Sequence, residues 1–145
     1  MKLIVKTLKR LFVSIFVIFF IVSCEGDSDT GGDENLIGKW KYIHWKDTVE
    51  NNVTTEGDWI HKCDTNYDYI TFSENGTWEI VFYDTNCQVY EGHIGTWEKQ
   101  GSTIYFTSPQ GFWNHEEKIL ELTDTTLKTR SISNSRISVI TYQKQ

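Results

Sequence analysis

The feature that most constrains the fold is an alternation of apolar and polar residues that begins at Leu36 and runs to the C-terminus. Successive side chains of a β-strand point to opposite faces of a sheet, so an apolar residue at every second position predicts a strand with one buried face. Thr, Ile, Val and aromatic residues, which favour strands, are frequent in these stretches. The pattern predicts about eight short strands, at residues 39–45, 69–72, 77–84, 88–98, 103–106, 118–122, 126–132 and 137–142.

The connections between the predicted strands are mostly short. Asn75-Gly76 is typical of a two-residue hairpin turn, and clusters of Asp, Asn, Ser, Thr and Gly separate most of the other strands. Longer loops are expected at 46–62, which could hold a short helical turn, and at 107–117. Consecutive strands on short connections predict an all-β fold, an antiparallel up-and-down meander that closes into an eight-stranded barrel without exposed edges. A two-sheet sandwich is the alternative.

The N-terminal residues follow a different pattern. Basic residues precede an apolar run at 11–22, and Ser23 follows it. A helix of that length rises about 18 Å, which is too short for a hydrocarbon core of about 30 Å, and the whole arrangement is typical of a secretory signal peptide. The stretch IVSC at 21–24 resembles the lipobox of bacterial lipoproteins, which implies removal of residues 1–23 and lipidation of Cys24. A plain signal peptide or a short anchor helix is the alternative.

Residues 25–35 contain five acidic residues and three glycines. They have too few apolar side chains to offset the entropy of ordering, so 24–35 is predicted to be a flexible tether ahead of one domain at 36–145. The lipobox resemblance implies a cell-envelope protein, held in the lipid bilayer of the outer membrane by N-terminal acyl chains. An acidic run after the cysteine is also similar to the export signals of some surface-displayed lipoproteins.

The charge of the chain after Cys24 argues against one class of partner. Four of the 14 basic residues lie in the signal segment, which leaves 10 basic against 20 acidic residues, a net charge of −10. This balance repels nucleic-acid phosphates, so no nucleic-acid partner is expected. The same segment holds 6 Trp, 7 Tyr and 4 Phe, which is ample apolar mass for a core.

The domain begins with a short motif. The stretch GKW at 38–40 has the G-x-W pattern that opens the first strand of lipocalins, and the later stretches ITFSENGTWEI, GTWEKQGSTIYF, ILELTDTTL and TYQK resemble the lipocalin-like domains of bacterial envelope lipoproteins. The resemblance covers nearly the whole domain. It implies that Gly38 and Trp40 are structural, with Trp40 plugging one barrel end, and that an arginine, Arg130 or Arg136, packs over that indole.

Two cysteines remain in the domain. Cys63 and Cys87 would lie in an oxidising compartment after export, and they flank loops at the ends of neighbouring predicted strands. If those strands pair through the Asn75-Gly76 hairpin, both cysteines fall at the same barrel end, which predicts a disulfide. A metal site at His61 and Cys63 is the alternative, but no second pair of ligands follows it.

The sequence lacks the common motifs of catalysis. It has no G-x-S-x-G elbow, P-loop, dinucleotide-binding glycine set or H-E-x-x-H motif. Glu116 and Glu117 are adjacent, so on a strand they point to opposite faces and cannot converge as an acid–base pair. The four histidines are scattered. We therefore expect a protein that is not an enzyme and that uses no cofactor and no metal.

Two kinds of binding stay open. In the first, which the lipocalin resemblance implies, a small apolar or amphipathic ligand enters the barrel. The wall of the ligand site would consist of inward side chains, and the candidates are Tyr42, Trp78, Ile80, Phe82, Trp97, Ile104 and Phe106. The alternative is that these side chains fill the barrel completely. This set offers no charge to pair with an anion, so the ligand is expected to be uncharged or cationic.

In the second kind, the barrel is a rigid support whose loops bind an envelope protein or a glycan, as an inhibitor or accessory subunit does. The two long loops carry Trp59, Phe112 and Trp113, large aromatic residues that a loop does not need for folding. The alternative for these three side chains is that they cover the barrel ends. An aromatic-lined void would favour the first kind of binding, and a packed interior with a patch on the loops the second.

Overall fold

The computed structural model describes residues 33–49 and 53–145. The predicted signal peptide at 1–23 and the lipidation of Cys24 lie outside these residues. Within them, no helix is long and apolar enough to cross a bilayer. The described part has one short helix and nine strands, namely α2 (Asp33–Leu36), β1 (Gly38–Val49), β2 (Val53–Asp58), β3 (Tyr69–Phe72), β4 (Thr77–Tyr83), β5 (Val89–Gln100), β6 (Thr103–Thr107), β7 (His115–Leu122), β8 (Thr126–Ser133) and β9 (Arg136–Lys144).

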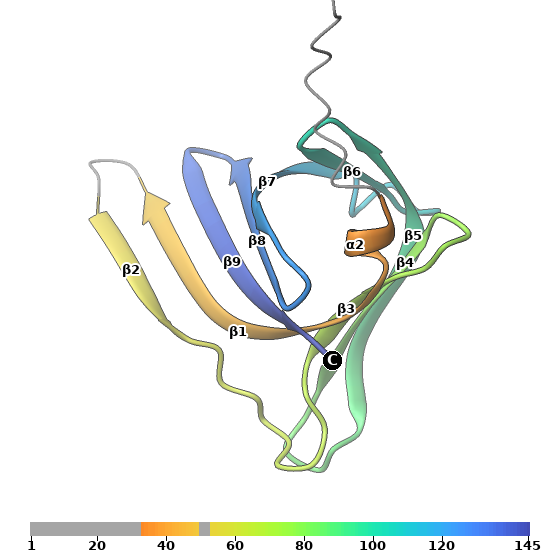
Figure 1. The fold of residues 1–145 in the computed structure, drawn as a ribbon. Coiled ribbons are helices and arrows are strands. Elements are labelled where there is room, and N and C mark those ends of the chain that lie inside the picture. The colour runs from red at the N-terminus through yellow and green to blue at the C-terminus, as the bar shows by residue number, and fades with distance from the viewer. Residues whose placement is uncertain (1–32, 50–52) are drawn as a thin grey trace, which may run out of the picture. The chain divides into compact units, whose positions relative to one another are not determined.

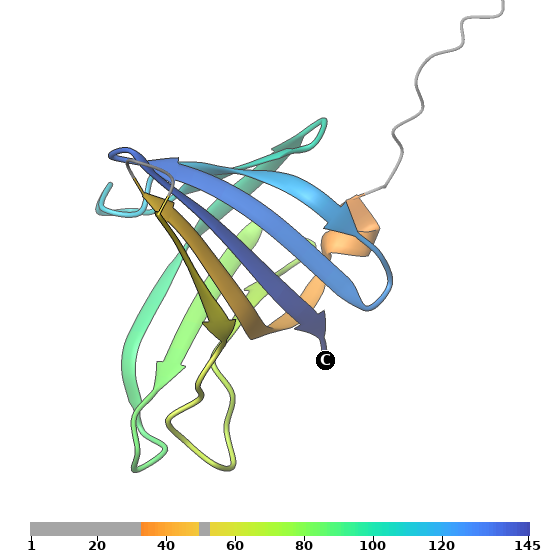
Figure 2. The ribbon, with the colours of Figure 1, turned by 90° about the vertical axis from the view of Figure 1, so that its left-hand side faces the viewer.

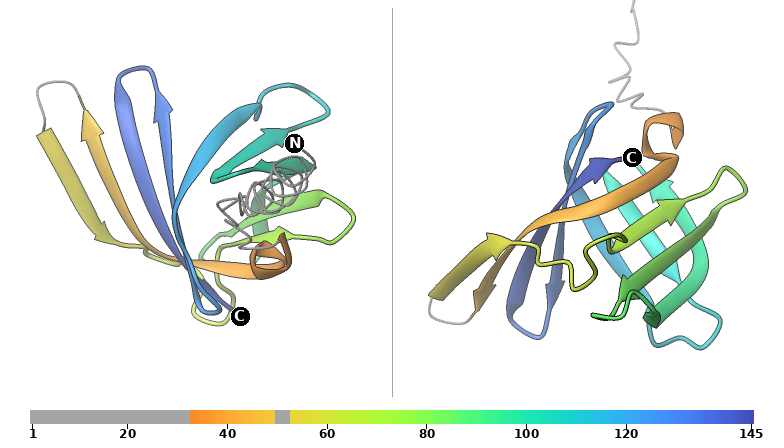
Figure 3. Two further views of the ribbon diagram at one scale, coloured as in Figure 1. Left: turned by 45° about the horizontal axis from the view of Figure 1, so that its top comes forward. Right: turned by 90° about the horizontal axis from the view of Figure 1, so that it is seen from below.

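Eight of the strands close into an antiparallel barrel, which confirms the predicted fold class and excludes the two-sheet sandwich. The order around the barrel is β1-β3-β4-β5-β6-β7-β8-β9, and β9 pairs back with β1. Figure 1 shows β3 to β6 curving along one side, with β8, β9 and β1 side by side on the other. The views in Figures 2 and 3 show the strands inclined to one another as they wind around the barrel.

The ninth strand corrects the prediction for one of the long loops. The sequence predicts a loop at 46–62, but β1 continues to Val49 and the chain turns back along it as β2. β2 pairs with the C-terminal half of β1, whereas β3 pairs with the N-terminal half of the same edge. An ion pair between Lys46 Nζ and Glu56 Oε2, 3.0 Å apart and half exposed, joins β1 and β2 on the outer face. β2 therefore pairs with β1 but is not one of the eight strands that close the barrel.

Two further boundaries differ from the prediction. The loop expected at 107–117 spans only 108–114, because β7 begins at His115. Residues 33–35, the last part of the tether expected at 24–35, form α2 together with Leu36. The side chain of Leu36 is fully buried, and this burial offsets the entropy of ordering that the acidic residues before it cannot.

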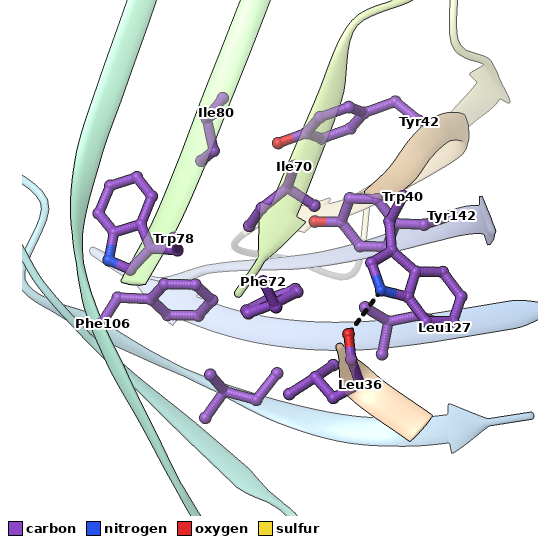
Figure 4. Packing of buried hydrophobic residues seen from close by; sticks show 11 residues of the cluster. Leu36, Trp40, Tyr42, Ile70, Phe72, Trp78, Ile80, Phe106, Leu127 and Tyr142 are labelled. Carbon is purple, nitrogen blue, oxygen red and sulfur yellow. Dashed lines mark hydrogen bonds between the residues drawn. The ribbon is translucent and has the colours of Figure 1, made fainter. Parts of the chain in front are cut away.

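The barrel end beside α2 is closed. Leu36 and Trp40 are both 0% exposed, and the indole N–H of Trp40 donates to the carbonyl oxygen of Leu36 at 2.8 Å, as Figure 4 shows. The ammonium group of Lys144 lies 5.1 Å from the centroid of the same indole. The cation over Trp40 is therefore a lysine of β9, and not Arg130 or Arg136 as the resemblance implies. A lysine can take this place because an aromatic face attracts either cation.

Aromatic rings fill the half of the barrel next to the closed end (Figure 4). The ring centroid of Phe106 lies 5.9 Å from that of Phe72 and 5.7 Å from that of Trp78. No side chain of the buried cluster is more than 6% exposed, and its members are Leu36, Trp40, Tyr42, Ile70, Phe72, Trp78, Ile80, Ile104, Phe106, Leu127 and Tyr142. Interdigitated rings of this kind leave a ligand little room, so any binding inside the barrel has to occur at the other end.

Gly95 is required by the packing of this half. A Cβ atom at position 95 would meet the carbonyl oxygen of Thr107 and, at 2.8 Å, the indole nitrogen of Trp78. The same indole N–H donates to the carbonyl oxygen of Thr96 at 3.0 Å, so it cannot move away without losing a hydrogen bond. We expect Gly95→Ala to lower the free energy of unfolding by about 1 to 3 kcal/mol, the usual cost of overpacking.

Urea unfolding of the two proteins measures this difference. Gly57→Ala is the matched control, because its Cβ would meet the nearest atoms of Trp45 only at an ordinary distance of 3.7 Å. Equal stability of the two alanine variants would contradict the prediction.

Candidate functional site

The barrel end opposite α2 is open. Along β5 and β7, half-buried residues alternate with exposed ones, and the half-buried ones share a face with core residues across the strand pairs. His93 pairs with buried Ile80, and Glu117 pairs with buried Ile104, so both point inward. Inward side chains that stay half-buried, beyond a core that is almost fully buried, indicate that solvent reaches the barrel interior from this end.

Aromatic side chains line the open end. The ring of Tyr42 lies at the boundary with the packed half, with its centroid 4.5 Å from Trp59, 5.6 Å from Phe82 and 4.8 Å from Tyr142. Trp59, Phe82 and Trp113 pack against the core but remain partly exposed. Partly exposed aromatic rings around a closed floor form a surface that an apolar molecule could bury.

Hydroxyl groups lie at the floor of this end. The hydroxyls of Tyr42 and Tyr142 are hydrogen-bonded to each other, and Thr129 bonds to Tyr142. Burial, and after it the negative charge of Glu117, raises the pKa of Tyr42 and of Tyr142 well above the ordinary value of a phenol. Both phenols therefore stay neutral, and the floor offers hydroxyl donors and acceptors within the electrostatic reach of Glu117.

His115 and Glu117 form an ion pair on the inner face of β7. The Nε2 atom of His115 lies 3.1 Å from Oε1 of Glu117, and its Nδ1 atom lies 3.1 Å from the carbonyl oxygen of Trp113. Both partners only accept hydrogen bonds, so the doubly protonated imidazolium satisfies the two contacts together. Burial lowers the pKa of His115, but the hydrogen bond to Glu117, the charge of Glu117 and the Trp113 carbonyl outweigh it, so the pKa lies above its ordinary value.

A second histidine and carboxylate face inward from β5. The Nε2 atom of His93 lies 3.0 Å from Oε1 of Glu91, and its ring packs against Trp113 with centroids 4.3 Å apart and the ring planes tilted by 39°. The indole of Trp113 also lies 6.2 Å from the ring of His115, between the two histidines. Trp113 therefore joins the polar groups of β5 and β7 into one continuous lining.

The segment between β2 and β3 supplies another part of the wall. Trp59, at its start, donates its indole N–H to Oδ2 of Asp68 at 2.7 Å, while Oδ1 of Asp68 accepts the backbone N–H of Tyr83 at 2.9 Å. The predicted disulfide is present: Cys63 and Cys87 are bonded, with their Cα atoms 4.9 Å apart, which ties this segment to the turn between β4 and β5. The metal site considered as an alternative at Cys63 is thereby excluded.

The predicted ligand wall divides between the two halves of the barrel. All seven residues belong to the core cluster or pack against it. Within it, Tyr42 and Phe82 adjoin the open end through their contacts with Trp59. The other five lie in or beside the packed half, namely Trp78, Ile80, Trp97, Ile104 and Phe106.

The three aromatic residues predicted on loops also differ in role. Trp59 and Trp113 turn toward the barrel interior, whereas Phe112 is 85% exposed. Phe112 lies beside a pocket of about 400 Å³ between β5 and the loop 108–114, which Trp113 and His93 also line. The loop thus contributes one residue to the lining of the open end and one to the outer surface.

Sequence reasoning missed the polar lining. His93, His115, Glu91 and Glu117 were not in the predicted wall, although the pairing of β5 and β7 with buried residues places them inward. A signal was present, because each histidine stands two residues from a glutamate and residues of equal parity share a face. Among residues 33–49 and 53–145, no three His, Cys, Asp or Glu side chains are grouped so that they could hold a metal ion.

Comparison with known proteins identifies the family. Residues 36–129 match the lipocalin-like domain family, and no curated protein sequence matches the chain. Among solved structures, a de novo designed fluorescence-activating β-barrel is similar at 12% identity and a TM-score of 0.42, over 77% of this chain and 95% of that one. The bovine lipocalin allergen Bos d 2 is similar at 12% identity and a TM-score of 0.42, over 77% of this chain and 73% of its own. The family match covers well over half of the sequence, and the chain therefore belongs to the lipocalin-like domain family.

Proposed function

We propose that this protein binds a small apolar or amphipathic molecule at the open end of its barrel, and that it is not an enzyme. The observation that carries the proposal is the set of half-buried aromatic side chains, Trp59, Phe82 and Trp113, that face inward there. Burying apolar surface contributes about 25 cal/mol for each Å², so a ligand that covers these rings gains affinity from surface that folding leaves exposed. Membership of the lipocalin-like family agrees with this use of the barrel.

A neutral apolar dye, N-phenyl-1-naphthylamine, tests the proposal. We expect its fluorescence to rise saturably on titration with the protein, because the dye enters an apolar site. Phe82→Ala should weaken dye binding by about tenfold, since loss of a ring in contact with the ligand removes on the order of 1.4 kcal/mol of binding free energy. Phe112→Ala is the control, because this ring is 85% exposed and outside the barrel. No saturable binding by a folded, disulfide-bonded sample would contradict the proposal.

A second candidate function is recognition of a protein or glycan by the loop 108–114. The observation that favours it is the exposure of Phe112 beside the pocket of about 400 Å³. In this case Phe112→Ala would abolish partner binding and leave the dye titration unchanged, whereas Phe82→Ala would do the reverse. The same pair of variants therefore distinguishes the two functions.

We also propose that the protein is anchored in the cell envelope through acyl chains on Cys24. Lipid anchoring would place the barrel close to a membrane that supplies amphipathic molecules. The lipobox resemblance of residues 21–24 supports this proposal. Each buried methylene contributes about 0.8 kcal/mol, so two or more acyl chains would hold the protein stably.

Cys24→Ala is expected to abolish anchoring and the incorporation of radiolabelled palmitate. The wild type should carry the label and sediment with membranes. Cys63→Ala is the matched control, because this cysteine lies in the domain and should not affect labelling. Equal labelling of wild type and Cys24→Ala would refute the lipoprotein proposal.

A further inference from the structure

Three carboxylates lie at inward positions of the open end, each beside a basic side chain. Within the described residues, the inward positions of this end on β1, β5 and β7 carry the carboxylates Asp47, Glu91 and Glu117. Arg136, which is 60% exposed, lies 3.7 Å from Asp47, His93 lies 3.0 Å from Glu91, and His115 lies 3.1 Å from Glu117. The chain after Cys24 also has a net charge of −10. This excess of acidic residues over the domain favours a cation over an anion near its surface and its open end.

Glu117 is the least exposed of these three carboxylates. Its side chain is 15% exposed, compared with 43% for Glu91, and its charge acts on the buried hydroxyls of Tyr42 and Tyr142 at the floor. His115 bonds to one oxygen of Glu117, and a carboxylate has about four acceptor positions. Glu117 can thus accept a further hydrogen bond from a molecule that enters past the aromatic rings.

We propose that the ligand carries a cationic group with hydrogen-bond donors, such as a primary ammonium on an apolar body, and that Glu117 selects it. This inference rests on the proposed binding function. The apolar body would lie against Trp59 and Phe82, and the ammonium would donate to Glu117 beside the hydroxyls of Tyr42 and Tyr142. The faces of these aromatic rings also attract a cation, so the lining supports the ammonium before it reaches the carboxylate.

An anionic ligand finds each basic side chain of this lining already beside a carboxylate, with Arg136 beside Asp47, His93 beside Glu91 and His115 beside Glu117. His115 already uses both ring nitrogens, one on Glu117 and one on the Trp113 carbonyl. Before a ligand enters, the imidazolium of His115 balances the charge of Glu117. An ammonium that donates to Glu117 replaces that charge when His115 releases its Nε2 proton to solvent and keeps its Nδ1 proton on the Trp113 carbonyl. A carboxylate in the same place would face Glu117 directly, and like charges in a partly buried site repel strongly.

Three probes with the same eight-carbon chain test the inference: octylammonium, 1-octanol and octanoate. In calorimetric titrations, we expect the purified wild-type protein to bind octylammonium about tenfold more tightly than 1-octanol. The reason is that a hydrogen bond to a charged group raises the affinity by about a factor of ten or more. Octanoate should bind most weakly. Glu117→Gln should remove the preference, so that the variant binds octylammonium and 1-octanol with similar affinity.

Two further variants serve as controls. Glu116→Gln makes the same charge change on the exposed face of β7, and it should leave all three affinities unchanged. Glu117→Asp keeps the carboxylate and should keep the preference for octylammonium even if Glu117→Gln unfolds. Equal binding of octylammonium and 1-octanol by wild type, or a preference that survives in folded Glu117→Gln, would overturn the inference while the proposed function stands. Failure of all three probes to bind would overturn both.

Discussion

Trp40→Ala is expected to destabilise the protein more than any other single truncation in the closed end. The indole is fully buried, donates to the carbonyl oxygen of Leu36 and lies under the ammonium of Lys144. Its removal leaves a cavity, an unpaired carbonyl and a cation without its aromatic face. Truncation of a buried tryptophan costs about 3 to 5 kcal/mol, which corresponds to a decrease of roughly 15 °C or more in the melting temperature of a domain of this size.

Thermal unfolding followed by circular dichroism measures this decrease. Trp40→Phe should lose roughly half as much stability, because it keeps an aromatic ring but not the indole N–H. Phe112→Ala is the control for aromatic truncation on the surface, and it should melt within a few degrees of wild type because the ring is 85% exposed. If Trp40→Ala melts like wild type, Trp40 does not close the barrel.

Removal of the disulfide is expected to have the second largest effect. Cys63 and Cys87 are separated by 24 residues along the chain, so their bond closes a long loop that includes β3 and β4. In the chain-entropy model, opening a loop of this length lowers the free energy of unfolding by about 3 to 4 kcal/mol. The Cys63→Ser/Cys87→Ser double variant should therefore unfold at a clearly lower denaturant concentration.

The double variant should also affect the binding site, because the bond holds the segment that carries Trp59 and Asp68 beside the open end. Wild type under reducing conditions should match the stability of the double variant, which controls for the serine substitutions. Alkylation of the unreduced, denatured domain provides an independent check. Modification of two cysteines in that experiment would refute the disulfide.

Much of the barrel could be predicted from the sequence, because local rules govern it. The range of β3 agrees with the prediction, and β4, β6 and β8 agree within one residue at each end. Apolar side chains fill most of their inward positions, and the turns that flank them contain Gly, Asn, Asp, Ser or Thr. The disulfide could also be predicted from local rules, since a hairpin between neighbouring strands brings both cysteines to one end of the barrel.

The candidate site could be predicted only in part. The alternation correctly predicted that Tyr42 and Phe82 face inward, but it counted apolar residues and so passed over His115 and Glu117, which continue the same inward face with polar side chains. Which inward residues are packed and which adjoin solvent depends on where α2 closes the barrel. That position is decided by contacts between Leu36, Trp40 and the distant strand β9.

By itself, the sequence determined the strand-rich fold class, the pairing of neighbouring strands and the disulfide, because period, turn chemistry and loop length act over a few residues. Only the tertiary structure decided that 53–58 forms β2, since VTTEGD lacks an apolar alternation and becomes a strand by pairing with the free half of β1. It likewise decided that Lys144 lies over Trp40 and that Glu117 comes close enough for its charge to act on Tyr42 and Tyr142. These contacts join residues that are far apart in the chain, and they exist only because the barrel closes and brings β9, β1 and β7 around one interior.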